Sequence, residues 1–248
     1  MFSLGSSREV FRQVVRKSHC GKANRWPPVP GIIDGLPTRI YNSFKDLNNQ
    51  RTRTMRNIGV IGAGHVGLVT AACFARLGHR VVCADNDVEK VERLKRLDMP
   101  FYEPGLEEIV RETVTGQRLT FTHSIGELAE AAQAIFIAVG TPATAEGRAD
   151  LSYVEQVTVD PARALSEMSG QGKSRVYRLI VEKSTVPVLT GEWVKRTLEL
   201  LTPTGVEFDV AANPEFLREG CAIKDFMEPD RIVVGVENER SRKIFQEI

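Results

Sequence analysis

One stretch of the chain, residues 57–87, restricts the possible folds more than any other, because it has the pattern strand, glycine turn, helix, strand. A short apolar run at residues 58–61 is typical of a buried strand. The pattern G-x-G-x-x-G follows it directly, with glycines at Gly62, Gly64 and Gly67. The first glycine permits a sharp turn, the second lets the backbone approach a diphosphate, and the third lets the helix lie close to the strand. The stretch therefore predicts half of a dinucleotide-binding unit, whose helix N-terminus faces the phosphates.

The residue that ends the second strand of this unit tests the interpretation. Residues 80–84 form another apolar-rich run, and Asp85 directly follows it. In dinucleotide-binding units the acid that binds the ribose hydroxyls stands ~20 positions after the glycines, and the position of Asp85 is close to this. A carboxylate there accepts from a 2′-hydroxyl and repels a 2′-phosphate, which favours NAD over NADP. The alternative is a strand-helix-strand unit that binds no dinucleotide, but glycines, helix and acid all stand in register.

The composition, 42% hydrophobic and 26% charged over 248 residues, is that of an ordinary globular protein. No run approaches the ~18 consecutive apolar residues that cross a bilayer, so we expect no membrane partner. The net charge of +1 combines a basic stretch over residues 1–56 with a mildly acidic remainder, which gives no reason to expect a nucleic-acid partner. The four cysteines lack metal-ligand spacing, so we expect no metal, and free thiols in a reducing, cytoplasmic compartment.

Residues 1–56 differ from the rest of the chain, and we expect them to form an irregular N-terminal extension to a main domain at residues 57–248. Apolar positions between residues 4 and 15 alternate with arginines and would suit one short basic amphipathic helix. A Pro/Gly-rich stretch, WPPVPGIIDGLP, follows. Three interpretations stay open: a mitochondrial-type presequence, a flexible tail, or an over-extended reading frame, since Met55 stands directly before the first strand. We favour a tail or misplaced start over targeting.

Beyond residue 87, the patterns of strand and helix alternate to the last residue. Strands are predicted at residues 119–122, in AIFIAVGTP, and at residues 177–182, 208–212 and 231–236. Helices are predicted after residue 87, after Pro104, at residues 125–132, 152–168 and 192–201, and from residue 239. The alternation predicts an α/β fold with a doubly wound, mostly parallel Rossmann-type sheet that binds ligands at the carboxyl ends of its strands. The loops GAGHVG, GTP, KST and NPEFLREG follow strands, so we expect them to share one crevice.

Five motifs in order resemble one family: GAGHVG with Asp85, FYEPGL, VGTP, EKSTVPV, and NPEFLREG followed by AIKDFMEPDRIVVG. Over residues 57–248 the chain resembles the N-terminal, NAD-binding domain of the UDP-glucose/GDP-mannose dehydrogenase family. These enzymes use NAD to oxidise a nucleotide sugar at C6 to a uronate. The last motif is closer to the UDP-glucose branch than to the GDP-mannose branch, so the resemblance implies oxidation of UDP-glucose to UDP-glucuronate.

The resemblance also implies roles for single residues. Its cofactor-binding positions are Gly62, Gly64, His65, Val66, Gly67, Asp85, Lys90, Thr141, Thr185 and Glu219. Its catalytic positions are Thr185 and Glu215, and its substrate-binding positions are Glu215, Phe216 and Leu217. A hydroxyl and a carboxylate that converge on one water can direct it at a thioester carbonyl. From the residues alone, capping of a strand end by Thr185 and a helical surface pair of Glu215 with Glu219 remain open.

The cysteine that the resemblance assigns to the covalent step, in a motif like GFGGSCFPKD, is not among these 248 residues. Cys221 is not that cysteine, because it directly follows NPEFLREG. We therefore expect the NAD-binding half of the enzyme, a fragment or truncated product, inactive alone and a homo-oligomer only if the C-terminal part is present. The alternatives are a GDP-mannose 6-dehydrogenase fragment, a Rossmann dehydrogenase of the 3-hydroxyacyl or 6-phosphogluconate type, and a non-catalytic NAD-binding module.

Overall fold

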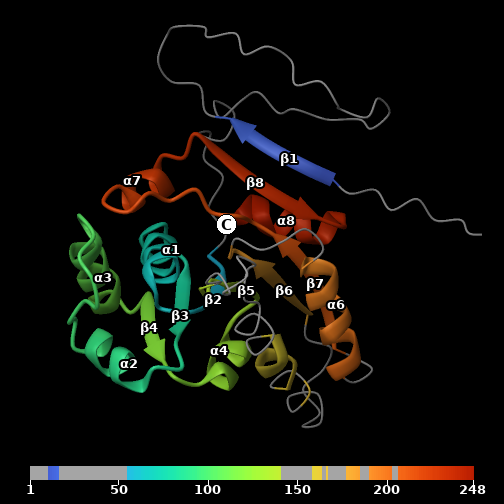
Figure 1. Ribbon diagram of the computed structural model, residues 1–248, viewed down its shortest axis with the longest axis horizontal. Helices are drawn as coiled ribbons and strands as arrows, with labels where there is room; N and C mark the ends of the chain where they lie inside the picture. Colours follow the sequence, from blue (N-terminus) through green and yellow to red (C-terminus); the bar gives the residue numbers. More distant parts are fainter. Residues whose placement is uncertain are drawn as a thin grey trace, which may run out of the picture.

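The structure, a computed structural model, describes residues 11–16, 55–140, 158–163, 166, 177–184, 190–202 and 206–248. Its strands are β1 (Phe11–Arg16), β2 (Asn57–Ile61), β3 (Arg80–Ala84), β4 (Leu119–Thr122), β5 (Ala134–Ile137), β6 (Tyr177–Glu182), β7 (Glu207–Ala212) and β8 (Arg231–Val236). They form one sheet with the order β1-β8-β7-β6-β5-β2-β3-β4 (Figure 1). Strands β2 to β7 pair in parallel, whereas β8 runs antiparallel to β7 and β1 antiparallel to β8.

The order of the parallel strands places a switch point between β2 and β5. From β2 the chain adds β3 and β4 on one side, then returns to add β5, β6 and β7 on the other. Crevices at such switch points, outside the carboxyl ends of the strands, are where open α/β sheets bind their ligands. The glycine loop directly follows β2 and therefore lies at this point.

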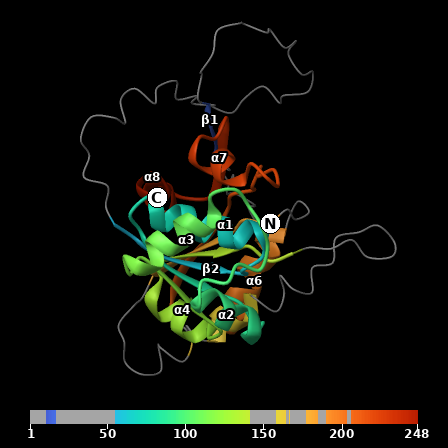
Figure 2. The ribbon, with the colours of Figure 1, turned by 90° about the vertical axis from the view of Figure 1, so that its left-hand side faces the viewer.

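Helices cover both faces of the sheet. They are α1 (His65–Arg76), α2 (Val88–Lys95), α3 (Leu106–Thr115), α4 (Ile125–Ala131), α6 (Thr190–Leu201), α7 (Ala222–Met227) and α8 (Glu239–Glu247), and residues 158–163 are also helical. Figure 2 shows α1, α3 and α8 on one side of the sheet and α4 and α6 on the other. Among the described residues, no helix is both long and apolar enough to cross a membrane.

Alternate residues of the central strands supply the two cores. Phe136 of β5 lies in the core beneath α1, whereas its neighbours Ile135 and Ile137 lie in the core beneath α4 and α6. All four residues of β5 are fully buried, as expected for a central parallel strand covered on both faces. The predicted doubly wound, mostly parallel sheet is confirmed, and strands 177–182 and 231–236 have the predicted limits.

The N-terminal extension differs from the prediction at residues 11–16, where a short helix was expected. These residues form β1, which pairs with β8 from Phe11 opposite Val236 to Arg16 opposite Arg231. A short isolated helix is marginal in water, whereas β-branched residues such as Val14 and Val15 suit a strand and the edge of β8 offers unpaired backbone groups. Helix α7 was not predicted at all. Residues 1–10 and 17–54 of the extension lie outside the described part of the chain.

Candidate active site at the carboxyl edge of the sheet

The glycine loop brings α1 against the end of β2. Gly62 has φ of +103° and its N–H donates to the Ala84 carbonyl at 2.7 Å. A Cβ atom added to Gly67 would lie 1.9 Å from the Gly62 carbonyl oxygen, so only glycine permits this approach of helix to strand. A Cβ atom on Gly64 would meet no described atom within 4 Å. Gly62 and Gly67 therefore shape the turn, and Gly64 leaves space for a ligand.

The backbone N–H groups at the N-terminus of α1 also lack a side-chain cap among the described residues. The N-cap residue of this helix is Gly64. Three other helices are capped by side chains, namely those of Asp87 on α2, Ser124 on α4 and Asn238 on α8. The first N–H groups of a helix need acceptors and carry partial positive charge, so an uncapped start suits an anion such as a diphosphate. His65 and Val66 begin this helix, as the predicted site requires.

Asp85 links the end of β3 to the glycine loop. Its Oδ2 atom accepts from Ala63 N–H at 2.7 Å, and its Oδ1 atom accepts from Asp87 N–H at 3.0 Å. The ammonium of Lys90 donates to both oxygens at 3.1 Å. The two predicted cofactor residues Asp85 and Lys90 therefore form one ion pair, and they lie beside the loop that carries Gly62 and Gly64.

Glu103, which was not among the predicted site residues, joins the glycine loop to a segment over 100 residues later. Its carboxylate accepts from His65 Nε2 at 2.8 Å, from Gly220 N–H at 2.8 Å and from Ala222 N–H at 2.9 Å. Burial would raise the pKa of Glu103, but the hydrogen bonds from His65 and the two backbone groups outweigh it and hold that pKa below its ordinary value. The only sequence signal was its place in FYEPGL.

The carboxyl ends of β6 and β7 bury two further charged side chains. Lys183 Nζ donates to Asn213 Oδ1 at 3.2 Å, and burial lowers the pKa of Lys183 to about 8 against an opposing effect of Glu215. Glu182 Oε1 accepts from Ser184 N–H at 3.1 Å, and within the described part of the chain its Oε2 has no partner. Burial raises the pKa of Glu182 to about 7.

Glu215, which is predicted to be catalytic, lies in the segment between β7 and α7, together with the predicted substrate residues Phe216 and Leu217. Residues 213–218 are not helical, so the alternative of a helical pair of Glu215 with Glu219 is wrong. Glu215 accepts from Leu217 N–H, and Leu217 is partly buried against the main core. Phe216 is exposed, with the Arg231 guanidinium 4.7 Å from its ring centroid. Glu219 is exposed at the turn before α7.

Helix α7 brings these parts together. Its first residue, Ala222, donates to Glu103, and its Phe226 ring lies 5.8 Å from Lys183 Nζ. The loops after β2, β3 and β7 are thus connected at one edge of the sheet, as the shared crevice requires. Thr141 and Thr185, predicted at the nicotinamide end, lie outside the described residues.

The described cysteines and acids give no further chemistry. Cys73 and Cys83 are buried, which confirms the interpretation as small core side chains, and burial raises the pKa of each thiol to about 12. Cys221 is exposed. No group of three or more His, Cys, Asp or Glu residues among those described is arranged to hold a metal ion.

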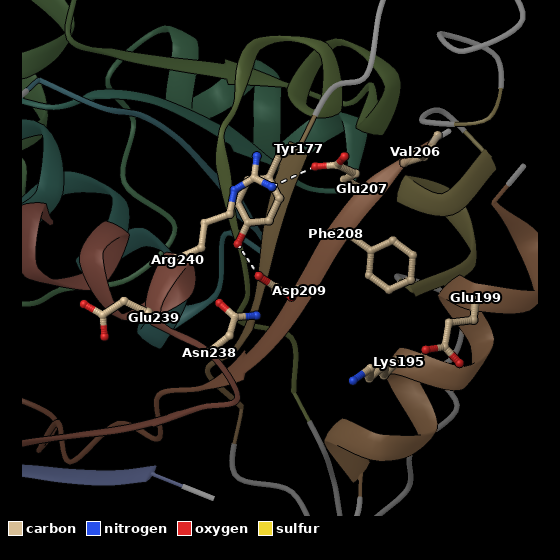
Figure 3. Close-up of a pocket in the computed structure, with 10 residues that line it drawn as sticks. All are labelled: Tyr177, Lys195, Glu199, Val206, Glu207, Phe208, Asp209, Asn238, Glu239 and Arg240. Atoms are coloured by element: carbon tan, nitrogen blue, oxygen red, sulfur yellow. Dashed lines mark hydrogen bonds and ion pairs between the residues drawn. The ribbon is translucent and has the colours of Figure 1, made fainter. Parts of the chain in front are cut away.

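A groove of about 600 Å³ lies at the opposite edge, where β6 and β7 begin (Figure 3). Within it Tyr177 donates to Asp209 at 2.7 Å, and Arg240 stacks 3.5 Å from the Tyr177 ring centroid and pairs with Glu207. These contacts fasten α8 to the sheet. The groove has no glycine loop or open helix start, so it does not compete with the carboxyl edge as a dinucleotide site.

A parallel sheet with a glycine loop at its switch point and an acid after β3 defines a dinucleotide-binding domain of the Rossmann type. Residues 56–248 match the family model described as "UDP-glucose/GDP-mannose dehydrogenase family, NAD binding domain". The chain therefore belongs to the UDP-glucose/GDP-mannose dehydrogenase family, which confirms the resemblance of its motifs, and NAD is the cofactor of this domain.

Known relatives agree with this assignment. UDP-glucose 6-dehydrogenase of Bacillus subtilis is 44% identical over 195 residues, which are 78% of this chain and 40% of that protein. The enzyme of the same name from Pseudomonas aeruginosa is 49% identical over 179 residues, or 71% of this chain and 38% of that protein. The chain thus spans about two fifths of these relatives.

Solved structures give the same result. A UDP-glucose dehydrogenase from the archaeon Pyrobaculum islandicum matches 80% of this chain and 44% of its own, with a TM-score of 0.74 and 44% identity. A GDP-mannose dehydrogenase from Pseudomonas aeruginosa, in a ternary complex, matches 78% of this chain and 43% of its own, with a TM-score of 0.72 and 33% identity.

Proposed function

We propose that this chain is the NAD-binding part of a UDP-glucose 6-dehydrogenase, and that the whole protein oxidises UDP-glucose to UDP-glucuronate. The choice of UDP-glucose is supported by relatives of that name at 44% and 49% identity, against 33% for the GDP-mannose dehydrogenase structure. The free, buried thiols of Cys73 and Cys83 support a reducing, cytoplasmic location.

The observation that carries the proposal is the open start of α1 next to a buried carboxylate. In this assignment the glycine loop and the first residues of α1, His65 and Val66, hold the NAD diphosphate, and Asp85 accepts from the adenosine ribose. A carboxylate offers about four acceptor positions, and Ala63, Asp87 and Lys90 already use those of Asp85. A ribose hydroxyl therefore enters only when Lys90 releases one oxygen, so we assign Lys90 to the ribose as well.

The opposite side of the crevice suits the chemical steps. NAD, when bound, accepts a hydride from the alcohol carbon of the sugar. Lys183 and Glu182 are buried with pKa values of about 8 and about 7, so each can gain or lose a proton near neutral pH. We assign Glu215 to the orientation of water, Glu219 to the nicotinamide end, and Phe216 and Leu217 to the sugar nucleotide. Thr141 and Thr185 stay predictions of the sequence.

Calorimetric titration with NAD tests the cofactor site. Asp85→Asn removes the charge that accepts from the ribose, and we expect NAD affinity to fall roughly 10- to 100-fold, as for loss of hydrogen bonds to a charged group. Asp98→Asn is the matched control, because it removes an exposed carboxylate that pairs with Arg93 on α2. Equal affinity of the two variants would contradict the role of Asp85, provided thermal unfolding shows both to be folded.

Turnover tests the substrate. These 248 residues lack the cysteine motif, so we expect them to bind NAD but to release no NADH with UDP-glucose. The protein from its source, with any further residues it carries, is expected to form NADH with UDP-glucose in preference to GDP-mannose. Rapid NADH formation by the 248 residues alone would contradict the assignment of the covalent step to a residue outside them.

A further inference from the structure

The carboxylate of Glu103 joins two parts of the chain that lie far apart in the sequence. Its Oε2 atom accepts from both His65 Nε2 and Gly220 N–H, each at 2.8 Å, and its Oε1 atom accepts from Ala222 N–H at 2.9 Å. His65 is the first residue of α1, directly after the glycine loop. Gly220 lies in the turn that ends the segment 213–221. One side chain therefore bridges the diphosphate end of the site and the segment assigned to catalysis.

We propose that Glu103 is a positioning residue that couples NAD binding at the glycine loop to the placement of residues 213–221. The inference rests on the proposed function, because it requires NAD at this loop. A diphosphate on the first turn of α1 restricts the movement of His65. Through Glu103 this restriction reaches the Gly220 N–H, which shares a peptide unit with the Glu219 carbonyl. The backbone beside Glu219 is then held in place when the cofactor is bound.

The bridge is stiff at each of its ends. Glu103 is only 4% exposed, and its own carbonyl accepts from Leu106 N–H at the start of α3. The His65 ring lies against Phe101, with ring centroids 5.2 Å apart. Gly220 has φ of +80°, a left-handed conformation that glycine adopts readily and that fixes the direction of its N–H. These contacts limit the movement of Glu103, of the His65 ring and of the Gly220 backbone.

The charge of Glu103 makes the three hydrogen bonds interdependent. A buried carboxylate that loses a donor carries an incompletely solvated charge, which costs more than a neutral hydrogen bond does. Because a carboxylate only accepts, His65 Nε2 must carry the hydrogen in this arrangement. Movement of α1 away from Glu103 therefore weakens the site that also holds Gly220 and Ala222, and ordering of α1 strengthens it.

Thermodynamic linkage sets a quantitative expectation. If NAD stabilises the placement of Gly220 by some factor, the ordered segment must raise NAD affinity by the same factor. Couplings of this kind typically amount to about 5- to 150-fold. A variant that breaks the bridge should therefore lose NAD affinity and NAD-induced ordering by similar factors. A residue that merely stabilises the fold would not link the two quantities.

Amide hydrogen exchange at Gly220 and Ala222, with and without saturating NAD, tests the coupling. In the unmodified chain we expect NAD to slow exchange about tenfold at both amides. In Glu103→Gln, which keeps the side-chain shape but not the charge, we expect less than about threefold slowing and about tenfold weaker NAD binding. Glu107→Gln is the matched control, because Glu107 is an exposed glutamate on α3 that pairs with Arg111. It should behave as the unmodified chain.

A second variant covers the case in which Glu103→Gln folds poorly. His65→Phe removes the donor to Glu103 but keeps a ring against Phe101, and without NAD it should speed amide exchange at Gly220. In the double variant with Glu103→Gln, the same His65→Phe change should have no further effect on this exchange. NAD binding with full protection of Gly220 in Glu103→Gln, or unchanged Gly220 exchange in His65→Phe, would overturn the coupling and leave the proposed function intact. Failure of the unmodified chain to bind NAD would contradict both.

Discussion

The two sides of the crevice each bury a glutamate, but the pKa of the two carboxyl groups is shifted in opposite directions. Glu103, beside the glycine loop, is 4% exposed, and Glu182, at the end of β6, is 3% exposed. Glu103 accepts from three donors, and its pKa lies below the ordinary value. Among the described residues, Glu182 accepts only from Ser184, whose N–H lies 3.1 Å from Glu182 Oε1, and burial raises its pKa to about 7. The hydrogen bonds to Glu103 therefore outweigh the effect of burial, whereas at Glu182 burial outweighs the hydrogen bonds from Ser184.

This difference in pKa separates carboxylates that hold the structure of the site from groups whose protonation changes near neutral pH. On the glycine-loop side, Asp85 and Glu103 have their oxygens occupied by backbone and side-chain donors, so they fix a shape to which a ligand can bind. On the side of β6 and β7, Glu182 and Lys183 titrate near neutral pH, which is typical of groups that exchange protons during a reaction. Each side should therefore respond differently to loss of its buried charge.

The largest effect is expected on the glycine-loop side. Glu103→Ala leaves His65, Gly220 and Ala222 without their acceptor, and we expect the free energy of unfolding at pH 7 to fall by roughly 3–5 kcal/mol. Urea denaturation measures this change. Folding lowers the pKa of Glu103. Its contribution to the free energy of unfolding is therefore complete above pH 4.5, the ordinary pKa, and disappears as the pH falls through the lower pKa of the folded state. The variant should thus lose part of the acid sensitivity of the unmodified chain; an unchanged stability would remove the contrast.

A smaller effect of opposite sign is expected at Glu182. Its pKa rises from 4.5 to about 7 on folding, which corresponds to at most roughly 3 kcal/mol of destabilisation once the group is ionised. Between these pH values the folded state binds more protons than the unfolded state, so this group makes stability fall as the pH rises from 4.5 to 7. Glu182→Gln removes that slope, and above pH 7 we expect the variant to be more stable than the unmodified chain.

Urea denaturation from about pH 2 to about pH 9 separates the two sides in one series, because the contribution of Glu103 is lost below pH 4.5 and that of Glu182 changes between pH 4.5 and about 7. If Glu182→Gln were destabilising at every pH, the carboxyl group of Glu182 would have donors that the described residues do not include. The explanation of the raised pKa of Glu182 would then be wrong, whereas that of the lowered pKa of Glu103 would be unaffected.

Local patterns predicted most of this architecture, and contacts between distant residues explain what was missed. Strand 177–182 and the glycine loop each show in a few neighbouring residues, because apolar alternation and glycine spacing are local. Glu103 gave no such signal, since its partners lie 38 and 117 or more residues away. Strand β1 was missed for the same reason, because the edge that it pairs with, β8, lies near the other end of the chain.

The smallest effect is expected for a glutamate that belongs to neither side. Glu107 on α3 is 63% exposed at its side chain and pairs with Arg111 one turn away at 2.7 Å. Water solvates both charges well, and an exposed pair gains little after the two side chains lose their freedom. Glu107→Gln should therefore change the free energy of unfolding by less than about 0.5 kcal/mol. A change as large as that at Glu103 would show that the number of donors to a carboxylate does not rank these three glutamates, and the contrast between the two sides of the crevice would lose its physical basis.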